Sequence, residues 1–433
     1  MITWFAWRRA EADLRAKFLR IVLPLLALSI VVLISVCNPS TRVLSAAGQP
    51  VGLAARNDYL RFLPSTVWPA DTIGDFVFKA GLILVGLNIL LAKPRRRHQR
   101  LLLAGIAANT AVLAFVGSLY NLAGATKILG IVSSPNQHFF ASFVYYNHWG
   151  GFAVLGAAAA AGLGIDYYRH SCGVPWRDTP ALIYAVAALF ILLSLPISGA
   201  RASSAVGAVF VVVVALRLYV SKGPGNRRGL ITAIAMAASI ALIATMTFFI
   251  AGKSADFMAR KTAAEFADLQ TGGIGDARIP IYKETWKLFL QKPVFGWGWH
   301  SYRYAFRRVQ TLEFKMQTEQ KEMSFFVDAH NDWLQLLAEM GLVGALLVLA
   351  SVAGVTRVAA CRWWRMSPSF EILTGLGCLG MLASVDFPFA CPAIFVAAST
   401  LVSTAGSIAS RRERQAYRSG SSEAGSLAAF TSQ

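Results

Sequence analysis

The chain has 433 residues, of which 56% are hydrophobic and 15% charged, with a mean hydropathy of +0.52 and a formal net charge of +19 at pH 7. A soluble protein carries roughly a quarter charged residues, so this composition excludes an ordinary water-soluble enzyme. The basic residues are distributed as membrane topology requires, and we therefore predict no nucleic-acid partner.

Apolar segments recur along the chain at about the length that crosses a bilayer, roughly 20 residues. We predict an all-α, polytopic integral membrane protein with about 10 and at most about 12 transmembrane helices. The predicted spans are residues 18–37, 73–92, 101–120, 147–165, 179–197, 202–220, 229–251, 333–357, 369–384 and 388–408.

Basic residues are unevenly divided between the two sides of these spans. More than half of the 41 Lys and Arg lie in the two terminal segments and in the connections on the same side, with KPRRRHQR at 93–100 as the strongest cluster. The short connections on the opposite side carry few. By the positive-inside rule both termini are predicted to be cytoplasmic. Such charges also contact anionic headgroups, so membrane lipids are predicted partners.

This topology divides the chain into four parts. They are N-terminal transmembrane helices (1–251), a large outer segment (252–332), C-terminal transmembrane helices (333–408) and a cytoplasmic tail (409–433), which we predict to be disordered. The five cysteines show no CxxC spacing, so we predict neither a metal site nor a disulfide framework. The sequence has no P-loop, GxSxG or HExxH motif.

Polar residues collect at the outer ends of the spans. In chain order, the first group is SPNQHFFASFVYYNHWGG with Asn147 and His148, and the second is SGARASS with Arg201. A charged residue beside two apolar helices is costly and usually faces a bundle interior or a wet cavity. The alternative is an arginine that extends to the membrane surface. The small residues around Arg201 favour a site.

The third group lies in the large outer segment, in DARIPIYKETWKLFLQKPVFGWGWHSY. Arg278 precedes a predicted amphipathic helix with Pro280 in its first turn. Arg278 is either a solvated charge or part of a site. Trp297 and Trp299 are interpreted as interfacial anchors or as surfaces that stack on sugars. His300, beside them, is compatible with either.

The fourth group, DAHNDWLQ, begins the span at 333–357, and the fifth, SVDFP with Asp386, joins the last two spans. Asn331 can cap the helix, but a cap does not require His330, whose imidazole exchanges protons near neutral pH. The alternative is an interfacial histidine beside a cap. Gln335 and Glu339 are spaced to form a polar stripe, and Glu339 within a span needs a partner.

Together these groups predict an anion site that faces outward. Two arginines and a helix N-terminus suit a phosphate, because the guanidinium fork binds two oxygens at once. A histidine nearby can act as a base. Since no nucleotide motif is present, a lipid-linked phosphate donor fits this site better than ATP.

At these residues the chain resembles the bacterial O-antigen ligase and polysaccharide polymerase superfamily. The matching motifs are SGARAS, DARIPIYKETWKLFLQKPVFGWGW and HNDWLQLLAEMGLVG, and the resemblance covers roughly 130–400. FASFVYYNHWGGF and SVDFPFACPA resemble elements of an exopolysaccharide-polymerase branch. The chain departs from the common pattern at Ala200, where many relatives have a more polar residue, and at Tyr146, where a basic residue is commoner.

The resemblance implies a GT-C-like helical fold and a metal-independent, inverting glycosyltransferase without a cofactor, in the bacterial inner membrane with its active site facing the periplasm. It implies transfer of an undecaprenyl-diphosphate-linked glycan to a sugar hydroxyl of lipid A–core or of another lipid-linked glycan. Arg201 and Arg278 would bind the diphosphate, and His330 would activate the acceptor. The predicted substrate-binding residues are Asn147, His148, His300, Asn331, Gln335 and Asp386.

Two alternatives stay open on the sequence. One is a transporter of a polar or anionic substrate, although transporters usually bind near the middle of the membrane and often contain repeats. The other concerns the acceptor, which separates a ligase from a polymerase. The elements around Asn147, His148 and Asp386 favour a polymerase.

Overall fold

The computed structural model describes residues 7–8, 12–46, 49–134, 139–171, 174–222, 278–309, 326–360 and 368–430. The predicted span at 229–251 and most of the large outer segment lie outside the described residues. The helices of the bundle are α2 (Ala12–Cys37), α3 (Pro69–Ala92), α4 (Arg96–Leu122), α5 (Tyr146–His170), α6 (Ala181–Ile197), α7 (Arg201–Lys222), α13 (Asp332–Ala360), α14 (Ser369–Leu382) and α15 (Pro392–Phe430).

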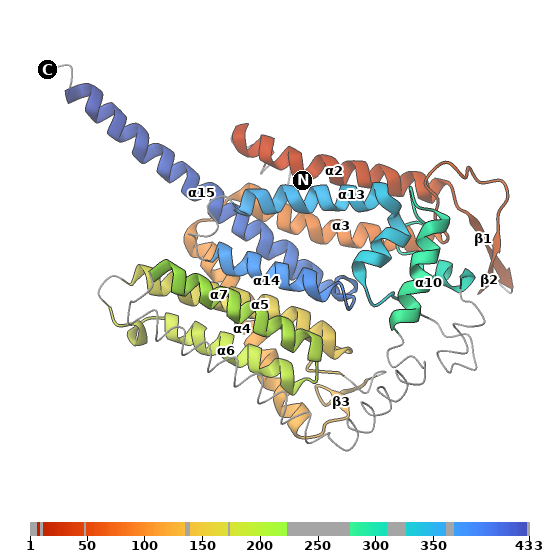
Figure 1. The fold of residues 1–433 in the computed structure, drawn as a ribbon, viewed down its shortest axis with the longest axis horizontal. Coiled ribbons are helices and arrows are strands. Elements are labelled where there is room, and N and C mark those ends of the chain that lie inside the picture. Colours follow the sequence, from red (N-terminus) through yellow and green to blue (C-terminus); the bar gives the residue numbers. More distant parts are fainter. Residues whose placement is uncertain are drawn as a thin grey trace.

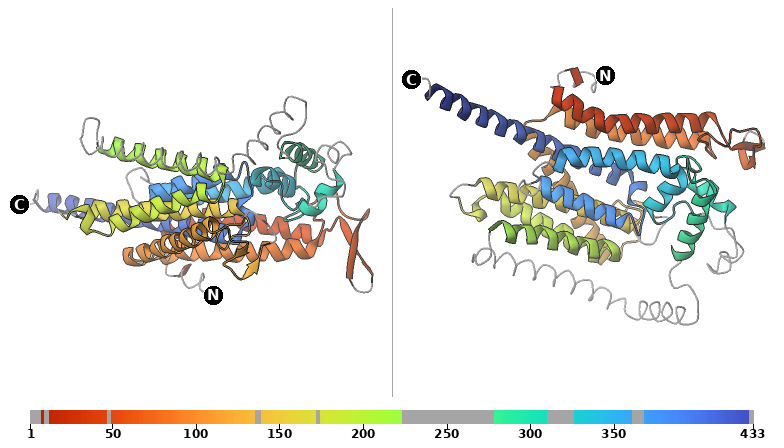
Figure 2. Two further views of the ribbon diagram at one scale, coloured as in Figure 1. Left: turned by 90° about the horizontal axis from the view of Figure 1, so that it is seen from below. Right: turned by 45° about the horizontal axis from the view of Figure 1, so that its top comes forward.

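Within these described ranges, seven helices are long and apolar enough to cross a membrane, and α6 and α14 are shorter apolar helices. The prediction of a polytopic, mostly helical membrane protein is therefore confirmed. The helices form two groups that meet along α13, α14 and α15 (Figures 1 and 2). One group contains α2, α3 and α13, and the other contains α4 to α7 with α14.

The helix α5 forms the centre of the second group because most of its residues are small. Its stretch of glycines and alanines is almost completely buried and packs against α4, α6, α7 and α14. Small residues let helix backbones approach closely, which favours helix association where no hydrophobic effect operates between helices. At Gly150 a Cβ atom would lie 2.0 Å from the Ser203 hydroxyl oxygen, so the first turns of α5 and α7 touch only because this residue is glycine.

A buried ion pair holds α7 against α14. Arg217 of α7 and Glu371 of α14 form a salt bridge in which neither side chain is exposed, and the guanidinium carbon of Arg217 lies 4.4 Å from the centre of the Phe370 ring. A charge inside a membrane bundle is tolerated when it is paired. The pair therefore fixes the register of two helices whose opposite ends lead to Arg201 and Asp386.

The described residues also contain two short strand pairs that the prediction of an all-α chain did not include. They are an antiparallel hairpin of β1 (Thr41–Ala46) and β2 (Gln49–Ala55), and a two-residue pair, β3 (Lys127–Ile128) and β4 (Val132–Ser133). Each strand is too short for its alternation to stand out from loop sequence. The helix α15 continues to Phe430, beyond the bundle (Figure 1), through most of the tail that was predicted to be disordered.

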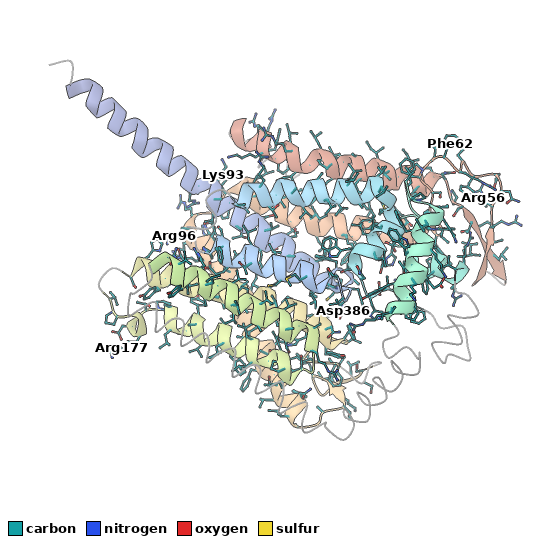
Figure 3. All side chains as sticks on the ribbon, in the orientation of Figure 1. Arg56, Phe62, Lys93, Arg96, Arg177 and Asp386 are labelled. Atoms are coloured by element: carbon teal, nitrogen blue, oxygen red, sulfur yellow. The ribbon has the colours of Figure 1, made fainter. Side chains whose placement is uncertain are left out.

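The charge distribution predicts that the inner and outer connections lie at opposite ends of the bundle, and labelled residues of these connections do so. Lys93, Arg96 and Arg177, from segments predicted to be inside, lie at one end, and Arg56 and Phe62, from a segment predicted to be outside, lie at the other (Figure 3). The hairpin β1–β2 and the helix α10 (Arg278–Gln291) also lie at the second end (Figure 1).

Candidate active site

The helix α13 is broken at Gly341, where the backbone has φ 60° and ψ −168°. At the break, backbone N–H and C=O groups lose the partners that a continuous helix would give them. The loop 293–298 supplies hydrogen-bond partners for these groups instead. The N–H groups of Leu342 and Val343 donate to the carbonyls of Pro293 (2.8 Å) and Val294 (3.1 Å). In return, the N–H groups of Trp297 and Gly298 donate to Ala338 (3.0 Å) and Glu339 (2.7 Å). The loop therefore acts as a strap across the break.

Two glycines make this strap possible. A Cβ atom at Gly341 would lie 2.3 Å from the carbonyl oxygen of Val294, and one at Gly296 would lie 2.4 Å from the carbonyl of Glu339. Both residues also have positive φ, which glycine adopts at no steric cost. Gly296 of FGWGW and Gly341 of AEMGLVG therefore both belong to the close contact between the strap and α13.

The polar residues that follow His330 in the sequence hold backbone segments in place. The carboxylate of Glu339 accepts the N–H groups of His300 (3.0 Å) and Tyr302 (2.9 Å). The amide oxygen of Gln335 accepts the N–H of Ala329 (2.9 Å). The side-chain oxygen of Asn331 accepts the N–H of Leu334 (3.0 Å), the contact of a helix N-cap. The oxygens of Gln335 and Asn331, two predicted substrate-binding residues, are therefore occupied in shaping the segment that carries His330.

His330 itself is held in a left-handed backbone conformation with φ 53°. The hydroxyl of Tyr282, on α10, donates to the carbonyl oxygen of His330 (2.7 Å). The imidazole packs edge-on against Phe387, with ring centres 4.7 Å apart. Its Nδ1 lies 3.9 Å from Oδ1 of Asp386, whose side chain is only 2% exposed.

The turn that carries Asp386 is fastened to the start of α13. The N–H of Asp332 donates to the carbonyl of Ala383 (2.9 Å), and the carboxylate of Asp332 accepts the N–H of Phe389 (2.9 Å). The indole N–H of Trp333 donates to the carbonyl of Gly380 (3.0 Å). These contacts bring Asp386 to His330 across more than fifty residues of sequence, at the end of the bundle that also carries α10 (Figure 3).

A second histidine approaches the same phenylalanine from α5. His148 packs edge-on against Phe387 at 5.0 Å, and Tyr145 stacks on Phe387 at 5.4 Å. The side-chain amide of Asn147 donates to the Tyr145 hydroxyl (2.8 Å). Burial raises the pKa of Tyr145, and the negative charge of Asp386 raises it further, whereas the positive charge of Arg278 lowers it. Arg278 therefore lies within electrostatic reach of this cluster.

Three buried polar atoms converge around Phe387 without a hydrogen-bond partner among the described residues. They are Nε2 of His148, Nδ1 of His330 and Oδ2 of Asp386. Buried polar atoms are almost always paired, and exceptions need an explanation. A ligand whose hydroxyl groups form hydrogen bonds with these three atoms would explain them.

The two arginines begin helices beside this cluster. Arg201 is the exposed first residue of α7, two residues before Ser203, which packs on Gly150 of α5. That contact places the start of α7 next to the turn that carries Asn147 and His148. Arg278 is the first residue of α10, one turn before Tyr282. The first residue of each helix therefore lies near the cluster around Phe387.

His300 is not brought to this cluster. Its Nδ1 lies 3.9 Å from Asp75 of α3, and the indole N–H of Trp299 donates to the same carboxylate (2.6 Å). Burial lowers the pKa of His300, and the charge of Asp75 opposes that change. Trp297 is 5% exposed and donates its N–H to Leu288 (2.9 Å), so its ring is packed inside the loop and does not offer a face to a sugar.

Sequence reasoning missed Tyr145, Tyr282 and Phe387 as parts of the cluster. Tyr145 and Phe387 adjoin predicted site residues, which is a weak local signal. Their stacking joins positions more than two hundred residues apart, and no periodicity or motif encodes such a contact. The bond of Tyr282 to the backbone of His330 depends on how α10 packs against α13, which the sequence does not show.

The model of the O-antigen ligase family matches residues 186–349. The match covers Arg201, Arg278, the strap and its glycines, and His330, whereas His148 and Asp386 lie outside it. No curated protein matches the chain. Residues 186–349 therefore match the O-antigen ligase family, and this match supports an assignment of the chain to that family.

Proposed function

We propose that this protein transfers a glycan from undecaprenyl diphosphate to a sugar hydroxyl on the periplasmic face of the inner membrane. The match of residues 186–349 to the O-antigen ligase family supports a glycosyltransferase-like enzyme that handles lipid-linked glycans. The observation that carries the proposal is the convergence of unpartnered atoms of His148, His330 and Asp386 beside two helices that begin with arginine.

In the proposed reaction, His330 takes the proton from the acceptor hydroxyl as its oxygen attacks the anomeric carbon. Asp386, 3.9 Å from Nδ1, stabilises the imidazolium that forms, so Nε2 is the nitrogen that faces the acceptor. The bond between the anomeric carbon and the diphosphate oxygen breaks, and undecaprenyl diphosphate leaves with the electron pair. Attack opposite the leaving group inverts the anomeric configuration.

In this proposal Arg201 and Arg278 bind the diphosphate. Each stands at the first position of its helix, where unpaired N–H groups and the helix dipole add to the attraction for an anion. Charge grows on the diphosphate as the glycosidic bond breaks, so preorganised guanidinium groups stabilise the transition state more than the ground state. His148, Asn147 and Tyr145 border the acceptor. Their resemblance to a polymerase branch favours another lipid-linked glycan as that acceptor.

Arg201→Lys is expected to lower turnover roughly 10- to 100-fold and to weaken donor binding, although the positive charge remains. A lysine ammonium cannot reproduce a contact to two phosphate oxygens, and one such contact is worth roughly 1.5–3 kcal/mol. Donor binding and product formation are measured with defined undecaprenyl-diphosphate glycan in the same membranes at matched expression. The control is Arg97→Lys, an exposed arginine next to Arg96, which lies at the opposite end of the bundle (Figure 3). Full activity of Arg201→Lys would remove Arg201 from the donor site.

A further inference from the structure

A second group of cations lies at the other end of α10, around Trp297. The ammonium of Lys292 lies 4.5 Å from the centre of the Trp297 ring and 5.0 Å from that of Tyr59. The guanidinium carbon of Arg308 lies 5.4 Å from the Trp297 ring. The ammonium of Lys292 also donates a hydrogen bond to the hydroxyl of Ser65 (2.9 Å). We refer to Lys292, Arg308 and Arg61 as the cationic cluster.

The charges of this cluster repel one another. The pKa of Lys292 is lowered to about 8, mainly by burial and in addition by the charges of Arg308 and Arg61. No carboxylate among the described residues contributes to this shift, and none of the three cations forms a salt bridge with them. Lys292 is half-buried, whereas Arg308 and Arg61 are exposed. A partly buried ammonium beside two other cations is costly unless an anion joins them. The cluster therefore favours an anionic ligand.

The surroundings of the cluster are those expected at a membrane surface. Arg61 stands between Leu60 and Phe62, whose side chains are 50% and 73% exposed, in the connection from β2 to α3. Lys292 precedes Pro293, which binds the N–H of Leu342 at the start of the long second part of α13. Phe62 lies at the end of the bundle beside the ends of α2 and α3 (Figure 3). Exposed apolar residues that flank a basic residue are typical of a segment at the headgroup level.

The cluster is separate from the candidate active site. Arg278 and Lys292 are 14 positions apart, which corresponds to about 20 Å along a helix at 1.5 Å per residue. A single diphosphate cannot contact both groups. The cations at the far end of α10 therefore have no part in the proposed reaction.

We propose that Lys292, Arg308 and Arg61 bind the phosphate of an anionic lipid whose headgroup lies at this end of the helices. The guanidinium of Arg308 offers a planar pair of donors, and the ammonium of Lys292 has donors left after its bond to Ser65. Tyr59 and Trp297 form an aromatic wall behind the cations. Leu60 and Phe62 enter the acyl region beside the lipid. This site anchors α10, and with it Arg278, to the membrane surface.

The test measures binding to the full-length protein, delipidated in detergent, by tryptophan emission. The probes are dioctanoyl phosphatidylglycerol, dioctanoyl phosphatidylcholine and inorganic phosphate. We expect saturable binding of phosphatidylglycerol, and binding weaker by at least about tenfold in the variant that combines Lys292→Gln with Arg308→Gln. The control is Lys287→Gln, which removes one charge from the same helix where the lysine is paired with Glu284. The unfolding midpoint of each variant shows that it is folded.

The three probes separate the sources of the phosphate. Tighter binding of phosphatidylglycerol than of both other probes supports an anionic lipid. Inorganic phosphate that binds as tightly as phosphatidylglycerol would overturn the lipid assignment, because the acyl chains and headgroup would then add nothing. Equal binding of phosphatidylglycerol to wild type and to the double variant would overturn the site itself. Because the readout is binding, failure here leaves the proposed transfer reaction unaffected.

The same titration at different pH tests the part played by Lys292. Lys292, with a pKa of about 8, loses its proton as the pH rises past that value. Binding of phosphatidylglycerol should therefore weaken between pH 7 and pH 9. Lys292→Arg keeps the charge at every pH, so this variant should bind without that dependence. An unchanged pH profile in Lys292→Arg would show that another group titrates and would contradict the assignment.

Discussion

His330→Ala is expected to lower turnover by about 10²- to 10⁴-fold, the usual contribution of a general base, while donor binding stays nearly unchanged. The expectation follows from the proposed position of the imidazole, whose Nδ1 lies 3.9 Å from Asp386 and whose Nε2 is left to face the acceptor. Loss of the base removes proton transfer in the transition state, whereas the diphosphate is held by other residues.

A matched control separates this chemical effect from a backbone effect. His330 and His300 both have positive φ, 53° and 58°, and asparagine tolerates that conformation. His330→Asn should be nearly as inactive as His330→Ala, because an amide does not accept the proton at neutral pH. His300→Asn should stay close to wild type, because His300 belongs to the group around Asp75. If His330→Ala stays within a few-fold of wild type, His330 is an interfacial residue beside a helix cap and base catalysis is wrong.

Gly341→Ala is expected to destabilise the protein by about 2 to 5 kcal/mol, the combined cost of a strained backbone and of a steric clash. The alanine Cβ would lie 2.3 Å from the carbonyl oxygen of Val294, and the residue would keep a φ of 60°. Relief requires the strap 293–298 to leave the break in α13, which would release the bonds that Leu342 and Val343 make to it.

The measurement is the unfolding midpoint of the purified protein in detergent. The control is Gly377→Ala in α14, where a Cβ would meet nothing within 4 Å and where alanine improves helix propensity. Gly377→Ala should therefore be neutral or stabilising. A Gly341→Ala variant as stable as Gly377→Ala would show that the interlock of strap and helix contributes little to the fold.

The sequence predicted the parts of the fold that depend on local properties. Length and hydropathy located the spans, because a bilayer demands about twenty apolar residues whatever the neighbours are. Charge asymmetry predicted which connections share an end, and Lys93 and Phe62 do lie at opposite ends. The β1–β2 hairpin was missed because strands of six and seven residues give little periodic signal.

The family motifs in the sequence pointed to Arg201, Arg278 and His330, but not to the contacts that position them. Gln335 and Glu339 were predicted to form a polar stripe, and in the structure they also bind backbone N–H groups of segments that meet them only in the folded chain. The pairing of His330 with Asp386 depends on Asp332 and Trp333 holding the turn after α14. Such contacts arise from tertiary packing, which no local pattern contains.

The most direct test of the proposed function uses the purified protein in liposomes with a defined undecaprenyl-diphosphate oligosaccharide, an acceptor and EDTA, without nucleotide. The measurement follows the new glycosidic bond and free undecaprenyl diphosphate together. Transfer predicts that both form in equal amounts, that the anomeric configuration inverts, and that His330→Ala abolishes both. Movement of intact donor across the bilayer without bond formation would contradict transfer and identify a transporter.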